Sequence, residues 1–114
     1  MKQRFEVILL DEVWELFDTI DEKTRLKIIY NIDKSTFQND PELFKKLDNE
    51  IWEFRTKYNK SHYRIFAFWD KSDNKKTLVI ATHGILKKTD KTPIKEIEKA
   101  KSMMKQYFEN KIKK

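Results

Sequence analysis

Three short strand-like runs follow one another through the middle of the chain, and they constrain the fold more than any other feature. Ile51–Arg55 alternates apolar and charged side chains, Tyr63–Trp69 is apolar after its second residue, and Leu78–Ile85 is the third run. The polar segments Lys57–His62 and Asp70–Lys76 separate them. Runs of this length are typical of strands, and short polar connections are typical of hairpins. We therefore expect an antiparallel meander in which Tyr63–Trp69 is a central strand, covered on much of both faces.

Further elements are expected on both sides of this meander. A short strand is expected at Phe5–Leu10, and helices are expected to begin at Asp11 and at Asp21, because aspartate is a suitable N-cap. A last helix is expected over Thr92–Phe108, where threonine suits the cap and proline the first helical position. The fold class is α+β, with a small, mostly antiparallel sheet, an N-terminal helical hairpin and a C-terminal helix. The helices are expected to lie largely on one face of the sheet.

The spacing of the apolar residues also predicts which helix faces are buried. After the break at Asn39–Pro41, the segment from Leu43 to Leu47 suits one or two helical turns. The expected inner face of the second helix consists of Leu26, Ile29, Tyr30 and Phe37, widened by Ile28 and Ile32. The aromatic and Met residues at helical spacing are most simply core, namely Trp14, Phe17, Met104, Tyr107 and Phe108.

Size and composition exclude several classes of protein. A chain of 114 residues is the size of one domain, so we expect residues 1–114 to form a single domain. It has no Cys, one Gly and two His, which excludes thiol catalysis and glycine-rich phosphate loops and argues against a His-rich metal site. We expect no metal ion and no cofactor. Purely apolar runs such as Val7–Leu10 are far too short for a membrane span, so we expect a cytoplasmic protein.

Charge is distributed unevenly along the chain. Residues 1–50 carry 8 basic and 12 acidic side chains, whereas residues 51–114 carry 17 basic and 7 acidic ones, a net charge of +10. Such a charge attracts polyanions, although a lysine-rich solvated surface would have the same composition. Only four of the 25 basic residues are Arg, and two of them, Arg55 and Arg64, lie in adjacent expected strands. The planar guanidinium binds two phosphate oxygens at once, so these two arginines indicate phosphate binding more specifically than the overall charge does.

Four motifs, in order, resemble those of a known toxin family. They are Ile51-Trp52-Glu53-Phe54-Arg55, Tyr63-Arg64-Ile65-Phe66, the strand end and turn from His83 to Thr89, and Lys91-Thr92-Pro93. The HigB-type toxins of the RelE/ParE superfamily have a similar series: an I-W-E-L-R strand, a Y-R-[IV] strand, an H-G-F-x-K-K-T turn, and T-P at the start of the last helix. The chain differs at Phe54 and at Ile85-Leu86, where the family carries Leu and commonly an aromatic residue. The resemblance covers roughly residues 43–108.

This resemblance implies a RelE/ParE-like fold and a toxin of a type II toxin–antitoxin pair. The RelE and HigB branches cleave mRNA, usually on the ribosome, and an antitoxin that often carries a helix-turn-helix domain neutralises them. The implied function is therefore a ribosome-dependent mRNA endoribonuclease, with a cognate antitoxin and ribosome-bound mRNA as partners. The ParE branch has the same fold but inhibits DNA gyrase. A non-enzymatic gyrase inhibitor therefore remains an alternative, as does a basic RNA-binding module without activity.

Metal-free RNA cleavage, by attack of a 2′-hydroxyl on the adjacent phosphate, requires cations and proton-transfer groups. If the hairpin between the first two strands of the meander is regular, Arg55 and Arg64 lie on one face near its turn. Both match family motif positions, so they are candidates for binding the phosphate, with Arg64 the stronger one. The alternative is a surface ion pair such as Arg55 with Glu53. Glu53 itself is a candidate base or a residue that orients Arg55.

The remaining candidates lie near the end of the third strand. Lys87, Lys88 and Thr89 are expected in the turn after it, where they match the family motif and are candidates to bind RNA. Lys87 and Lys88 are also candidates to stabilise the negative charge that develops on the phosphate, and Lys88 is the slightly stronger candidate of the two. His83 is the natural acid–base candidate, although a core histidine is at least as plausible. His62 is expected at the surface, at the opposite end of the meander from the Lys87-Lys88-Thr89 turn.

Overall fold

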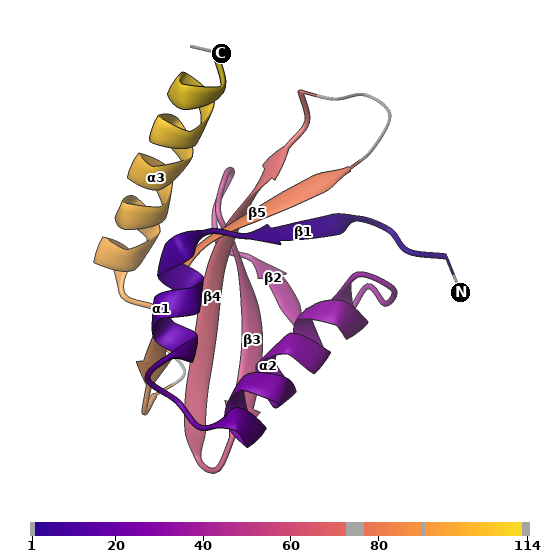
Figure 1. The fold of residues 1–114 in the computed structure, drawn as a ribbon, viewed down its shortest axis with the longest axis vertical. Coiled ribbons are helices and arrows are strands. Elements are labelled where there is room, and N and C mark those ends of the chain that lie inside the picture. Colours follow the sequence, from indigo (N-terminus) through magenta and orange to yellow (C-terminus); the bar gives the residue numbers. More distant parts are fainter. Residues whose placement is uncertain (1, 73–76, 90, 113–114) are drawn as a thin grey trace.

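The computed structural model describes residues 2–72, 77–89 and 91–112. Five strands and three helices form an α+β fold in the described part of the chain (Figure 1). In chain order the elements are β1 (Glu6–Leu9), α1 (Asp11–Phe17), α2 (Glu22–Ser35), β2 (Phe44–Lys46), β3 (Trp52–Tyr58), β4 (Ser61–Asp70), β5 (Leu78–Lys87) and α3 (Ile94–Ile112). The strands form one mixed sheet in the order β1-β5-β4-β3-β2.

The predicted meander is confirmed. β3, β4 and β5 pair antiparallel in sequence order, and β4 is the central strand of the sheet. β1 is paired parallel with β5, and β2 is paired antiparallel with β3. The sheet is therefore mostly antiparallel, with one parallel pair at its edge.

The hairpin between β3 and β4 is tighter than expected. The polar segment Lys57–His62 was predicted as a loop, but β3 continues to Tyr58 and β4 starts at Ser61. Only Asn59 and Lys60 form the turn, with φ angles of 51° and 67°. Two residues with positive φ match the twist of a hairpin and fix its register. The other predicted loop, Asp70–Lys76, lies partly outside the described residues, and Asp70 belongs to β4.

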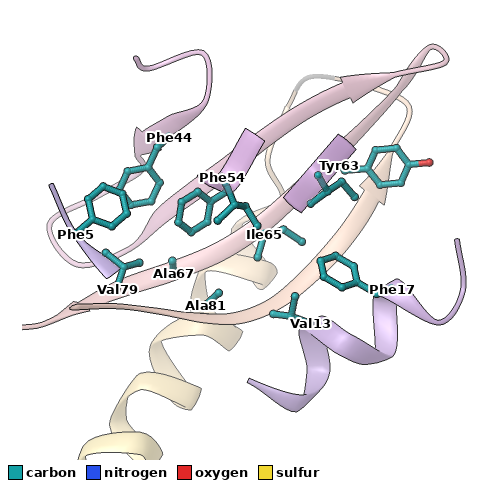
Figure 2. Close-up of a cluster of buried hydrophobic side chains, with 12 residues drawn as sticks. Phe5, Val13, Phe17, Phe44, Phe54, Tyr63, Ile65, Ala67, Val79 and Ala81 are labelled. Carbon is teal, nitrogen blue, oxygen red and sulfur yellow. The ribbon is translucent and has the colours of Figure 1, made fainter. Parts of the chain in front are cut away.

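The helices lie on both faces of the sheet, which corrects the expectation of one face. α1 and α2 cover a cluster that contains Val13, Phe17, Ile28 and Ile32 from the helices. Figure 2 shows Val13 and Phe17 of α1 against the residues of the sheet. α3 covers a second cluster, built around Ile51, Phe66, Phe68, Ile80 and Ala100, with Met104, Tyr107 and Phe108 packed against it. Because each face of β4 has its own helical layer, its strand is almost continuously apolar.

The N-terminal helices follow the predicted hairpin, with differences in detail. Asp21 caps α2 by accepting a hydrogen bond from the Thr24 N–H, as expected. Asp11 is the first residue of α1 rather than its cap. Two residues of the predicted inner face of α2, Leu26 and Tyr30, are 55% and 58% exposed, and the core side is formed instead by Ile28 and Ile32. Trp14 is also exposed, at 49%.

The segment around Phe44 is a strand, so the helical turns predicted there are wrong. The Phe44 ring stacks on Phe54 with centroids 4.3 Å apart and on Trp52 at 4.8 Å. Backbone hydrogen bonds from Arg55 N–H to Leu43 C=O and from Leu47 N–H to Ile51 C=O extend the pairing of β2 with β3. Cross-strand aromatic packing of this kind determines the structure of a segment too short to have a strong propensity of its own.

α3 begins two residues later than predicted. Thr92 does not act as its cap, because its hydroxyl donates a 3.0 Å hydrogen bond to Glu53 Oε1 in β3. At the other end of α3, Tyr107 Oη and Lys111 Nζ donate to Asp70 Oδ2 at 2.7 and 2.6 Å. Polar contacts therefore tie both ends of α3 to the sheet.

Candidate functional site

Polar side chains share the sheet face beside α3. The register aligns one residue from each of β3, β4 and β5 in successive rows across the sheet. Side chains at alternate positions along a strand point to the same face, so these rows lie on one side of the sheet. The rows are Glu53, Phe66 and His83, then Arg55, Arg64 and Ile85, then Lys57, His62 and Lys87.

Arg55 and Arg64 lie on one face near the hairpin turn, as predicted, and the register shows that they are direct cross-strand partners. The Nε atoms of both guanidinium groups lie 3.5 Å from Glu53 Oε2. The side chain of Arg64 is 2% exposed, that of Glu53 is 3% and that of Arg55 is 15%. Because a buried charge is costly unless it is paired, the buried Glu53 carboxylate allows two guanidinium groups to lie side by side.

Further hydrogen bonds hold this cluster in place. Arg64 Nη1 donates to its neighbour's carbonyl, that of Tyr63, at 3.3 Å. Arg55 Nη1 donates to the Pro41 carbonyl at 3.4 Å, in the turn before β2. The second oxygen of Glu53 accepts the hydroxyl of Thr92, so the segment before α3 also orients the carboxylate.

A pocket of about 440 Å³ opens beside the two arginines. Its lining consists of Glu42, Arg55, Lys57, His62 and Arg64, and these five residues are named here the basic pocket. Three of them are cations and one is a carboxylate. A site with excess positive charge beside a sheet suits an anionic ligand such as a phosphate group.

Lys87 belongs to β5 rather than to the turn after it, because the strand extends past the predicted end at Ile85. It is 8% exposed and is the cross-strand partner of His62, on the face that carries the basic pocket. Lys88 and Thr89 follow the strand and are exposed. The structure thus places Lys87 next to the pocket residue His62, although none of Lys87, Lys88 and Thr89 is among the residues that line the basic pocket.

His83 is a core histidine. It is 2% exposed and stacks on Phe66, with ring centroids 4.9 Å apart. Its Nδ1 lies 2.9 Å from Thr82 Oγ1, and its Nε2 lies 3.1 Å from Glu96 Oε1, in the first turn of α3. Burial lowers the pKa of His83, although the hydrogen bond to Glu96 opposes that shift. His83 therefore joins α3 to β5 and does not line the basic pocket.

His62 and Lys57 are pocket residues that the sequence did not indicate. The expectation that His62 lies far from the Lys87 turn is wrong, because the two residues face each other across β4 and β5. The available signal was its position two residues before Arg64, which places both side chains on one face of a strand. The polar segment that contains Lys57 predicts a loop, whereas Lys57 belongs to β3 and so lies on that face.

Neither a metal centre nor a membrane span is evident in the described residues. No three or more His, Asp or Glu side chains gather there in a way that could hold a metal ion. The helices observed there lack the combination of length and apolar character that crossing a bilayer requires.

A comparison with known families identifies the chain. No curated protein and no solved structure matches it. The profile of one family, described as phage-derived protein Gp49-like (DUF891), matches residues 15–105. This match spans most of the chain, from α1 to α3, and includes the basic pocket. The chain therefore belongs to the Gp49-like family of phage-derived proteins, a family associated with toxin–antitoxin systems.

Proposed function

We propose that the protein is the toxin of a type II toxin–antitoxin pair and that it acts as a ribosome-dependent mRNA endoribonuclease of the HigB/RelE type. One observation carries the proposal: Arg55 and Arg64 are paired across two strands, and one buried carboxylate contacts both guanidinium groups. A pair of guanidinium groups beside an open pocket matches the demands of a phosphate group at which negative charge builds up.

The proposed reaction needs no metal ion. The 2′-hydroxyl of one nucleotide attacks the adjacent phosphorus, and cations stabilise the charge that develops on the phosphoryl oxygens. Arg55 is the more exposed arginine and makes the first contact with the phosphate. Arg64 lies behind it, fixed by the central strand, and adds a charge whose position does not depend on a loop.

The lysines extend the same positive surface. Lys57 and Lys87 lie on either side of His62, on β3 and β5, and attract the flanking phosphates of the RNA strand. Lys88 and Thr89 are exposed just beyond β5, where they contact the RNA or ribosomal RNA outside the basic pocket. We expect Lys87 to contribute more to RNA binding than Lys88, because the position of Lys87 is fixed by the sheet.

The partner is a cognate antitoxin with a helix-turn-helix domain. Residues 51–114 carry a net charge of +10, which favours contact with an acidic segment of that antitoxin. Co-expression of the antitoxin is expected to abolish growth arrest by the toxin.

Primer extension on a translated reporter mRNA, after induction of the protein, tests the proposal. Cuts within translated codons are expected for the wild type, and Arg64→Ala is expected to lower the cleavage rate by about 100–1000-fold, as for other preorganised charge stabilisers. Arg64→Lys should restore only part of the activity, because the two-pronged contact is lost. Arg25→Ala is the matched control, since it removes the same charge from α2, on the opposite face of the sheet. Growth arrest without any mRNA cleavage, accompanied by loss of DNA supercoiling, would instead identify a gyrase inhibitor.

A further inference from the structure

His62 occupies the middle of the positive surface. Its cross-strand partners are Lys57 in β3 and Lys87 in β5, and it lines the basic pocket two residues away from Arg64. Alternate residues of a strand are separated by about 6.6 Å and point to the same face, and His62 and both arginines line the same pocket. A phosphate held by the arginines therefore lies within reach of the His62 imidazole.

The other proton-transfer candidates named from the sequence, His83 and Glu53, are buried and do not line the basic pocket. Both ring nitrogens of His83 have partners, Thr82 and Glu96, and the ring is buried beneath α3. Glu53 accepts from Thr92 with one oxygen and forms ion pairs with both arginines through the other. A carboxylate that is 3% exposed and holds two cations in place is not available to accept a substrate proton.

We propose, building on the function proposed above, that His62 is the catalytic residue that accepts the proton of the attacking 2′-hydroxyl. The neutral imidazole takes this proton while the 2′-oxygen forms its bond to phosphorus. The bond from phosphorus to the 5′-oxygen then breaks, and the leaving 5′-oxygen takes a proton from water. The products are a 2′,3′-cyclic phosphate and a 5′-hydroxyl end.

Glu42 is the competing base, because it also lines the basic pocket. It lies in the turn before β2 and is exposed, whereas His62 is fixed within the central strand between paired neighbours. Imidazoles as a class titrate closer to neutral pH than carboxylates, which suits a general base at physiological pH. Among the described residues, the charged groups that face His62 include Lys57, Lys87 and the two arginines as well as Glu42.

The test measures cleavage and binding separately on purified ribosomes programmed with mRNA. His62→Gln is expected to lower the single-turnover cleavage rate by about 100-fold or more, the usual contribution of a general base. Retention of the variant on programmed ribosomes should not change. Free imidazole should restore part of the activity of His62→Ala.

Each other outcome has a distinct meaning. If His62→Gln cleaves at the wild-type rate while Arg64→Ala does not, the role of His62 is refuted and the proposed function stands. Parallel loss of binding and cleavage would make His62 an RNA-binding residue and would also refute the inference. If Glu42→Gln lowers the cleavage rate without loss of binding and His62→Gln does not, Glu42 is the base and the inference is refuted. A wild-type protein that cuts no mRNA would refute the proposed function itself.

Discussion

Replacement of Asp70 should show how much the polar contacts at the end of α3 stabilise the fold. Asp70 is 2% exposed and accepts hydrogen bonds from Tyr107 Oη, Lys111 Nζ and both the N–H and the hydroxyl of Ser72. A hydrogen bond to a charged group contributes about 1.5–3 kcal/mol, but the ion pair with half-exposed Lys111 contributes less than about 1 kcal/mol. Because water can hydrate the released partners, Asp70→Ala should lower the free energy of unfolding by about 2–4 kcal/mol. Asp70→Asn keeps the shape and should cost about half as much.

The same contacts predict a pH dependence. Burial works to raise the pKa of Asp70, but hydrogen bonds from Lys111, Ser72 and Tyr107 outweigh it and hold that pKa well below its usual value. A lowered carboxyl pKa stabilises the fold above the unfolded pKa near ~4, and this stabilisation is lost as the pH falls below that value. Burial, with a hydrogen bond to Asp70, raises the pKa of Tyr107 to about 12. That contribution is complete below pH ~10 and is lost as the pH rises from there.

Urea denaturation followed by circular dichroism measures both effects. With a slope of about 1–3 kcal/mol per molar urea, Asp70→Ala should lower the midpoint by about 1 M or more. Glu109→Gln is the control, because it removes an exposed carboxylate from the same helix and should change stability by less than about 0.5 kcal/mol. The reasoning is refuted if Asp70→Asn is as stable as the control at pH 7. It is also refuted if the difference between wild type and Asp70→Asn does not shrink below pH ~4.

Two further substitutions test contacts near the site. Gly84→Ala should cost about 1–3 kcal/mol of stability, because the added Cβ would lie 2.5 Å from methyl groups of both Ile65 and Leu16, and unchanged thermal unfolding would contradict this packing. Thr92→Val should lower stability by about 1–2 kcal/mol and reduce mRNA cleavage, because Glu53 loses a hydroxyl donor. Thr92→Ser should keep both the stability and the cleavage activity. Equal losses in the two variants would show that the hydroxyl is not responsible.

The meander and the pairing of Arg55 with Arg64 could be predicted because both depend on local information. Alternation identifies the face of each arginine, and a short connection limits the possible register of the hairpin. The structure confirms that the two residues share a face near the turn, and it shows in addition that they lie opposite each other. The exact turn at Asn59 and Lys60 shortens the connection further but leaves the two arginines on the same face.

The elements that were predicted wrongly depend on distant parts of the chain. β2 has three residues, and its conformation is determined by aromatic rings on β3 and on the segment before β1. Likewise, the helical periodicity of α2 does not distinguish Leu26 and Tyr30 from Ile28 and Ile32. Which side is buried depends on how the helix packs against the sheet, and no local pattern encodes that angle.

The composition of the site beyond the two arginines depends on one irregularity in β5. Phe66 pairs with His83 and Ala67 pairs with Ala81, so Thr82 is an extra residue, a β-bulge in the ladder. Without it, every later side chain of β5 would point to the opposite face, because side chains alternate with a period of two. Lys87 would then leave the face of the basic pocket, and Gly84 would no longer lie beneath α1, where an added Cβ would come within 2.5 Å of a Leu16 methyl group. A single bulge therefore brings Lys87 opposite His62 and lets α1 approach the sheet. No local sequence pattern predicts this bulge.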